Sequence, residues 1–131
     1  MNRTQVELWE AGLRQALDVV DHALEDRFGD LLPRRPNRPR RHATANPRYD
    51  GLFTVDSKFS MGLLSQSGPG YVIDVRLAAI GHPTAAQREA ILEEAERALR
   101  AALPESFPGR RLEVVREGPI LRVTGDLSLE G

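Results

Sequence analysis

Three histidines are the side chains best suited to chemistry in this sequence, and none has a second histidine at metal-ligand spacing. His22 has Asp18 and Asp26 four residues to either side, which on a helix places three possible metal ligands on one face. A solvated acidic helix surface explains the same pattern. His42 lies among arginines, which repel cations, and a turn before a helix explains His82. We therefore expect no metal site and no cofactor.

Motifs for nucleophilic catalysis and for phosphate cradling are also absent. The 131 residues contain no cysteine, no Gly-x-Ser-x-Gly elbow, no P-loop and no Gly-x-Gly-x-x-Gly after a strand. The strand carboxylates Asp56, Asp74 and Glu113 each have a predicted basic neighbour across the strand, which is typical of surface ion pairs. The sequence therefore favours a protein without catalytic residues. An enzymatic or small-molecule pocket between the sheet and the first helix is an alternative.

The densest run of functional side chains is basic. Six arginines lie between Pro33 and Arg48 of a chain whose formal net charge is −1, and they are Arg34, Arg35, Arg38, Arg40, Arg41 and Arg48. They suit the phosphates of a nucleic acid or another polyanion. They equally suit a proline-rich extended tether, since no aromatic ring for base stacking precedes Tyr49. Because the whole chain has 17 arginines and one lysine, codon usage alone accounts for the enrichment, and we favour the tether.

Composition indicates one soluble globular domain. Hydrophobic residues make up 40% of the chain and charged residues 28%. No apolar run approaches the roughly 20 residues that cross a bilayer, and the N-terminus has the pattern of a helix rather than of a signal peptide. We expect a cytoplasmic protein that does not bind membranes.

Apolar residues at steps of three and four predict a helix over residues 4–31, starting from a capping box at Thr4 and Glu7. Residues 1–32 thus form an N-terminal amphipathic helix, 33–50 an Arg/Pro-rich linker and 51–131 an α+β core, within one structural domain. The helix spans roughly 40 Å, longer than a small sheet covers. We expect the uncovered stripe to form a homodimer interface of Val6, Trp9, Leu13, Leu17, Val20 and Leu24.

From Leu52 the apolar period changes to two, which predicts a hairpin around Ser-Gln-Ser-Gly-Pro-Gly at 65–70. Placing Lys58 opposite Asp74 sets Asp56 opposite Arg76 and matches both charges. The apolar side chains of both strands then share one face, and they include Phe53, Val55, Phe59, Met61, Leu63, Tyr71, Ile73, Val75 and Leu77.

A second helix over residues 85–103 follows a capping box at Thr84 and Gln87. A second hairpin follows with Glu117-Gly118 as its two-residue loop, which sets Val114 opposite Leu121 and Glu113 opposite Arg122. Leu127 and Leu129 continue the inward alternation of the last strand.

These elements predict a two-layer α+β fold: a long N-terminal helix, then hairpin, helix and hairpin, with a four-stranded antiparallel sheet covered on one face by helix. The outer sheet face is neutral and has no exposed aromatic pair. Such a protein is best interpreted as a small non-enzymatic, oligomerising interaction module with a protein partner. Binding of nucleic acid or another polyanion through residues 33–48 is the second interpretation.

Overall fold

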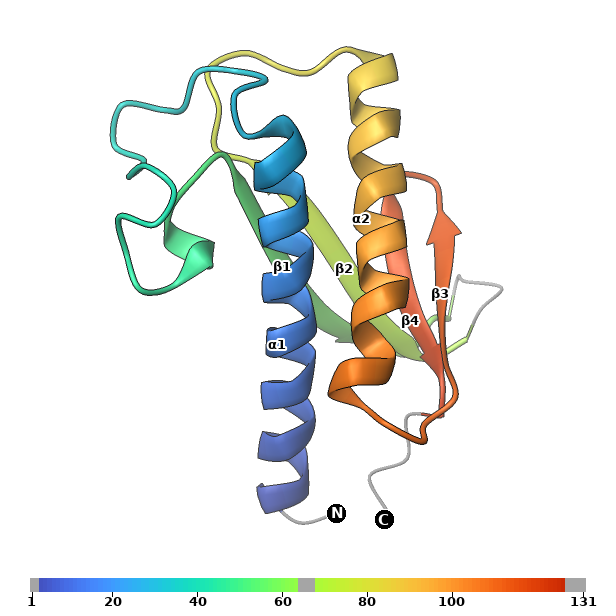
Figure 1. The fold of residues 1–131 in the computed structure, drawn as a ribbon. Helices are drawn as coiled ribbons and strands as arrows, with labels where there is room; N and C mark the ends of the chain where they lie inside the picture. The colour runs from blue at the N-terminus through green and yellow to red at the C-terminus, as the bar shows by residue number, and fades with distance from the viewer. Residues whose placement is uncertain (1–2, 64–67, 127–131) are drawn as a thin grey trace.

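The computed structural model describes residues 3–63 and 68–126. Helix α1 is Arg3–Phe28 and helix α2 is Ala85–Ser106. The first hairpin consists of β1 (Phe53–Ser60) and β2 (Gly70–Leu77), and the second of β3 (Leu112–Glu117) and β4 (Ile120–Gly125). A short 3-10 helix, η1 (Pro47–Tyr49), precedes β1. This order of elements is the predicted one (Figure 1).

The two helices lie side by side, antiparallel, on one face of the sheet (Figure 1). The strand order is β1-β2-β4-β3, and each neighbouring pair is antiparallel. The predicted α+β fold is confirmed, because both helices and the sheet bury their apolar faces in a single core. The largest fully buried side chains are Phe53, Leu17, Leu24, Leu52, Ile73, Ile91, Leu99, Leu121, Val20, Val55 and Val123. Within the described ranges, neither helix is long and apolar enough to cross a membrane.

The start of α2 follows its local sequence signal. The Thr84 hydroxyl accepts the Gln87 amide at 3.1 Å, and the Gln87 side-chain oxygen accepts the Thr84 amide at 2.8 Å. This reciprocal pair confirms the predicted capping box. The capping box predicted at Thr4 is wrong, because α1 already begins at Arg3.

The register of the first hairpin differs from the predicted one by two residues. Asp56 pairs with Asp74, and Lys58 pairs with Val72. The facing aspartates are tolerated because Arg76 bridges them, with nitrogen–oxygen distances of 2.7 Å to Asp56 and 3.2 Å to Asp74. A cross-strand ion pair contributes only about 0.2–1 kcal/mol, so matching charges is a weak guide to register. A shift of two preserves the sheet faces, which is why the predicted core survives it.

The second hairpin is also displaced by two residues. Its loop is Gly118-Pro119 rather than Glu117-Gly118, and Glu117 pairs with Ile120. Gly118 has a φ of 60°, as the first loop position of a type II′ turn requires, and the fixed negative φ of Pro119 suits the second position. The predicted continuation of this strand at 127–129 lies outside the described residues.

Arg122 on the outer face of β4 is buried, although the predicted outer face left it exposed opposite Glu113. It lies opposite Val115, and only 3% of its surface is exposed. Its guanidinium donates to the Gly68 carbonyl and lies 3.4 Å from the Glu117 carboxylate. Gly68 and Glu117 therefore help to cover Arg122 on the outer face of the sheet.

The predicted inner face of β1 is covered only in its first half. Phe53 and Val55 are fully buried, whereas Phe59 is 49% exposed and Met61 and Leu63 are exposed further. β1 is an outer strand that ends at Ser60, so Met61 and Leu63 follow the sheet rather than belong to it.

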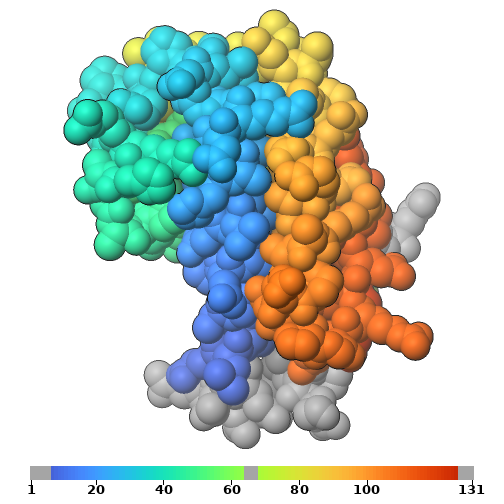
Figure 2. All heavy atoms as spheres, viewed as in Figure 1, coloured from blue at the N-terminus to red at the C-terminus, as the bar shows by residue number. Residues whose placement is uncertain are grey.

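Residues 33–50 fold into a loop beside the C-terminal half of α1 and the start of β1 (Figures 1 and 2). Arg34 forms a β-bridge with Ala79, and the Asn46 side chain caps η1 by accepting the Arg48 amide at 3.0 Å. This conformation differs from the extended, polyproline-like one that the proline content predicts. Backbone hydrogen bonds to Ala78 and Ile80, just after β2, and to Gly51, just before β1, hold the loop instead.

Five residues predicted for a homodimer interface lie in the core of the single chain: Trp9, Leu13, Leu17, Val20 and Leu24, each at most 4% exposed. The side chain of Val6 lies outside the described part of the chain. Helix α2 and the sheet cover the stripe, so these five side chains no longer argue for a partner. Homodimerisation itself stays a prediction.

Alanine at Gly62 tests whether close backbone packing holds the β1–β2 loop. Gly62 has a φ of 72°, and a Cβ there would lie 2.0 Å from the Gly68 carbonyl oxygen. We expect G62A to lower the free energy of unfolding in urea by about 2–4 kcal/mol. Gly68 is the matched control, because it has a φ of 76° but open space around a Cβ, so G68A costs about 1–2 kcal/mol. Equal losses for the two variants would contradict this packing.

Candidate functional site

Arg38 is the most engaged of the six clustered arginines. Its guanidinium donates to the carbonyls of Asp50, Gly51 and Phe53 and to the Thr54 hydroxyl, over distances of 2.8–3.1 Å. These four hydrogen bonds from one side chain fix the course of the backbone into β1. Arg38 is therefore a structural residue rather than a free phosphate ligand.

Of the other five arginines, some form ion pairs with the same chain and others are exposed to solvent. Arg41 pairs with Asp26 of α1 at 2.6 Å and so ties the loop to the acidic helix. Arg48 pairs with Asp56 of β1 at 2.7 Å. Arg34 is half-buried, whereas Arg35 and Arg40 are exposed. The predicted polyanion-binding set is thus not one continuous surface, because three of its six members bind groups of the same chain.

Arginines also cap carbonyl groups on both outer strands of the sheet. On β1, Phe53 and Val55 direct their carbonyls away from β2, where Arg38 and Arg14 donate to them at 2.9 Å. On β3, the outward carbonyl of Val114 accepts from Arg100 at 3.0 Å. An open strand edge is a template for pairing with another chain, and these caps block part of it.

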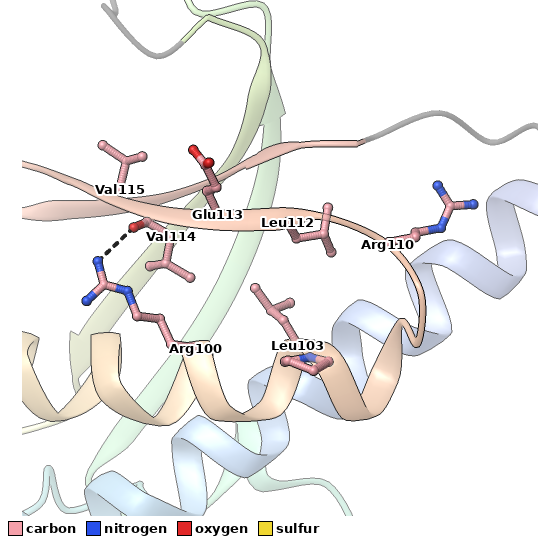
Figure 3. Close-up of a pocket in the computed structure, with 8 residues that line it drawn as sticks. Arg100, Leu103, Arg110, Leu112, Glu113, Val114 and Val115 are labelled. Atoms are coloured by element: carbon pink, nitrogen blue, oxygen red, sulfur yellow. Dashed lines mark hydrogen bonds between the residues drawn. The ribbon is translucent and has the colours of Figure 1, made fainter.

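A hollow of about 370 Å³ lies between α2 and β3, next to this edge. Figure 3 shows Leu103 of α2 and Val114 of β3 between helix and strand, with Arg100 reaching across to the Val114 carbonyl. Glu113 and Val115 extend from the opposite side of the strand. We call this space the β3 hollow, and the residues that line it are Arg100, Leu103, Pro104, Arg110, Leu112, Glu113, Val114 and Val115.

The β3 hollow has an apolar floor and a basic rim. Leucine, proline and valine side chains supply the floor, and the Arg100 and Arg110 guanidiniums supply hydrogen-bond donors. Among the described residues, no histidine, serine or threonine lines it. Such a surface can bind an apolar group next to an anionic one, and Glu113, which extends from the other side of β3 than Val114 (Figure 3), is the one carboxylate in this lining.

A second hollow, of about 330 Å³, occupies the predicted place of an enzymatic pocket, between α1 and β1. Its lining includes Arg14, Arg48, Asp56, Phe59 and Tyr71. Asp56 lies within 2.7–3.6 Å of three guanidiniums, those of Arg14, Arg48 and Arg76. A carboxylate so fully ion-paired is a structural anchor, so this pocket gives little support to the enzymatic alternative.

A third hollow, of about 470 Å³, lies where the 33–50 loop meets β1 and β2. We call it the arginine hollow, because its lining includes Arg35, Arg38, Arg48 and Arg76, together with Tyr49 and Asp56. It brings together three of the six predicted polyanion-binding arginines. Arg76 was not among the predicted anion-binding residues, because the predicted register assigned it to an ion pair with Asp56, which it forms.

Two buried carboxylates on α1 were not predicted. Asp21 is 2% exposed, and one of its carboxylate oxygens is buried without a hydrogen-bond partner. Burial, with the nearby Glu25, Asp18 and Asp50 carboxylates, raises the pKa of Asp21 to about 8. Burial also raises the pKa of Glu25, although its carboxylate accepts the Phe53 amide at 2.8 Å. The sequence signal for the burial of Asp21 and Glu25 was that each lies directly beside the apolar stripe of the helix.

Neither buried carboxylate lines any of the three hollows described. Across residues 3–63 and 68–126, no group of three metal-ligating side chains is placed to hold an ion. His22 and His42 do approach each other, with ring centroids 5.8 Å apart, and His82 is exposed elsewhere. The acidic pair on α1 thus bears on the pH dependence of stability through its raised pKa values.

A family model described as an uncharacterised protein matches residues 4–125 of the chain. The chain belongs to this family. A relative from Borreliella burgdorferi, described as an uncharacterized protein, is 32% identical over 106 residues, which cover 81% of this chain and 83% of that protein. No solved structure matches the chain.

The raised pKa of Asp21 predicts that stability falls as pH rises. Between about pH 4 and pH 8 the folded chain keeps a proton on Asp21 that the unfolded chain has released, so the free energy of unfolding decreases by up to about 1.4 kcal/mol per pH unit. We expect D21N to remove this part of the slope and to be more stable than the wild type at pH 8. Urea unfolding between pH 4 and pH 8.5 measures both curves.

D30N is the control substitution, because it removes a carboxylate at an exposed position just after α1. A residual slope in D21N is expected from Glu25, whose pKa is raised in the same direction. A wild-type curve that rises or stays level from pH 5 to pH 8 would show that Asp21 is ionised in the folded protein.

Proposed function

We propose that this protein is a small non-enzymatic interaction module that binds an extended protein segment at the edge of β3. The observation that carries the proposal is the β3 hollow, which places an apolar floor directly beside an outer strand. Peptides commonly bind such edges as an added strand, with backbone hydrogen bonds giving affinity and pockets selecting alternate side chains.

The backbone of β3 presents outward groups at alternate residues. The Arg111 carbonyl accepts the Asp126 amide on the β4 side, whereas the Val114 carbonyl faces outward and accepts from Arg100. By this alternation, Leu112 and Arg116 also direct their backbone groups outward. Arg100 is a long, exposed side chain that also pairs with Glu96 at 2.7 Å, so it can leave the carbonyl at little cost. An incoming amide would replace it.

The chemistry of the hollow specifies the partner segment. Its floor suits one aliphatic or aromatic side chain, and the guanidiniums of Arg100 and Arg110 favour a carboxylate close to it. We therefore expect an extended segment in which an apolar residue has an acidic neighbour.

Panning a library of random linear peptides against the full chain tests this function. We expect enriched peptides to combine an apolar and an acidic residue and to slow amide exchange at Leu112, Val114 and Arg116. Tryptophan at Pro104, an exposed residue of the lining, should fill the hollow and weaken binding about tenfold or more.

Pro108 is the matched control, because it is exposed a few residues away but does not line the hollow. P108W should bind the same peptides within about twofold of the wild type. The proposal fails if no peptide is enriched, or if P104W and P108W bind equally well. If β3 pairs with a second copy of the chain instead, the protein will form a dimer that P104W disrupts. The partner at β3 is then the chain itself and not a peptide.

A further inference from the structure

The arginine hollow carries a strong local charge that the proposed peptide site does not use. Four arginines and one aspartate line it, which leaves a formal charge of +3 on a chain whose net charge is −1. The hollow lies at the β1 side of the sheet, and β3 is the opposite outer strand. A ligand of this hollow would be an anion, bound at the other side of the sheet from β3.

Several guanidinium groups in the arginine hollow keep donors for a ligand. Arg35 is exposed and forms no ion pair within the described ranges, and the Arg76 side chain is 61% exposed. Asp56 is shared by Arg14, Arg48 and Arg76, while Asp18 and Asp74 also pair with Arg14 and Arg76. Each guanidinium has five N–H donors, which is more than these ion pairs use. The remaining N–H donors of these planar guanidiniums can pair with two oxygens of a phosphate at once.

Exposed rings accompany the arginines. Tyr49 lines the arginine hollow and is 57% exposed, with the Arg48 guanidinium 5.9 Å from its ring centroid. Phe59, which is 49% exposed, lines the neighbouring hollow between α1 and β1. Arg48 and Asp56 belong to both hollows, so the two form a continuous track along the edge of β1.

We propose that this track binds single-stranded nucleic acid, with phosphates on Arg35, Arg48 and Arg76 and a base stacked on Tyr49. Basic grooves with exposed aromatic rings are the usual surface for single strands, because every base has a face that can stack. An acidic peptide would use the arginines but not the rings. The exposed rings therefore favour a nucleic acid over a peptide.

Fluorescence anisotropy with a labelled oligothymidylate of about twelve nucleotides, at low salt, tests the site. We expect micromolar binding that weakens steeply with added salt. R35Q and R76Q should each weaken it about threefold to tenfold and lower the salt dependence. R40Q is the matched control, because Arg40 is an exposed arginine of the same loop that does not line the hollow. Equal losses for R35Q and R40Q would show a diffuse charge effect and overturn the site.

Variants at Tyr49 distinguish a site for nucleic acid from a site for any polyanion. Y49A should weaken oligothymidylate about fivefold to tenfold, with Y49F close to the wild type, and should leave binding of inorganic polyphosphate unchanged. Polyphosphate binding as tight as the oligonucleotide, together with no effect of Y49A, would contradict a single-strand site.

Asp56 provides a variant that should gain binding. D56N frees Arg48 and Arg76 from their shared carboxylate, so a folded D56N protein should bind the oligonucleotide about threefold or more tighter. Circular dichroism establishes folding before the titration. Failure of the wild type to bind at low salt ends this proposal and leaves the peptide site at β3 untouched.

Discussion

Satisfying the backbone groups at the open edges of a small sheet is the constraint that most shapes this protein. Four strands leave two outer edges, and each exposes alternate amides and carbonyls to pairing with other chains. Side chains bind part of both edges: Arg14, Arg38 and Glu25 along the start of β1, and Arg100 along β3. Arginine suits this role because one guanidinium can donate to several oxygens at once.

The same constraint explains where the candidate sites lie. Each hollow borders an outer strand at a point where capping side chains, rather than a neighbouring strand, cover the backbone. At β3, Arg100 donates to the outward carbonyl of Val114, next to the apolar floor of the β3 hollow. Along β1, four arginines and one aspartate line a hollow beside the exposed Tyr49 ring. The two edges therefore differ in chemistry although both are protected by arginine.

Much of the fold was predictable, because period-two and period-3.6 patterns report burial directly. Phe53, Val55 and Ile73 occupy the core as expected, and Thr84 caps α2 as expected. Both hairpin registers were predicted wrongly by two residues. A two-residue shift leaves the faces unchanged, so hydrophobic alternation cannot detect it, and the loops decide it through Gly118-Pro119 and the packing of Gly62.

The sequence by itself determined the α+β class, the two helices and four strands, and the lack of a recognisable catalytic motif, since these follow from local pattern and residue type. Only the tertiary structure decided what each arginine does. Arg38 and Arg41 hold the 33–50 loop in place, and Arg35 and Arg76 line one hollow. The apolar stripe of α1 packs into the core of the same chain. These outcomes depend on contacts between residues far apart in sequence, for which the sequence carries no local signal.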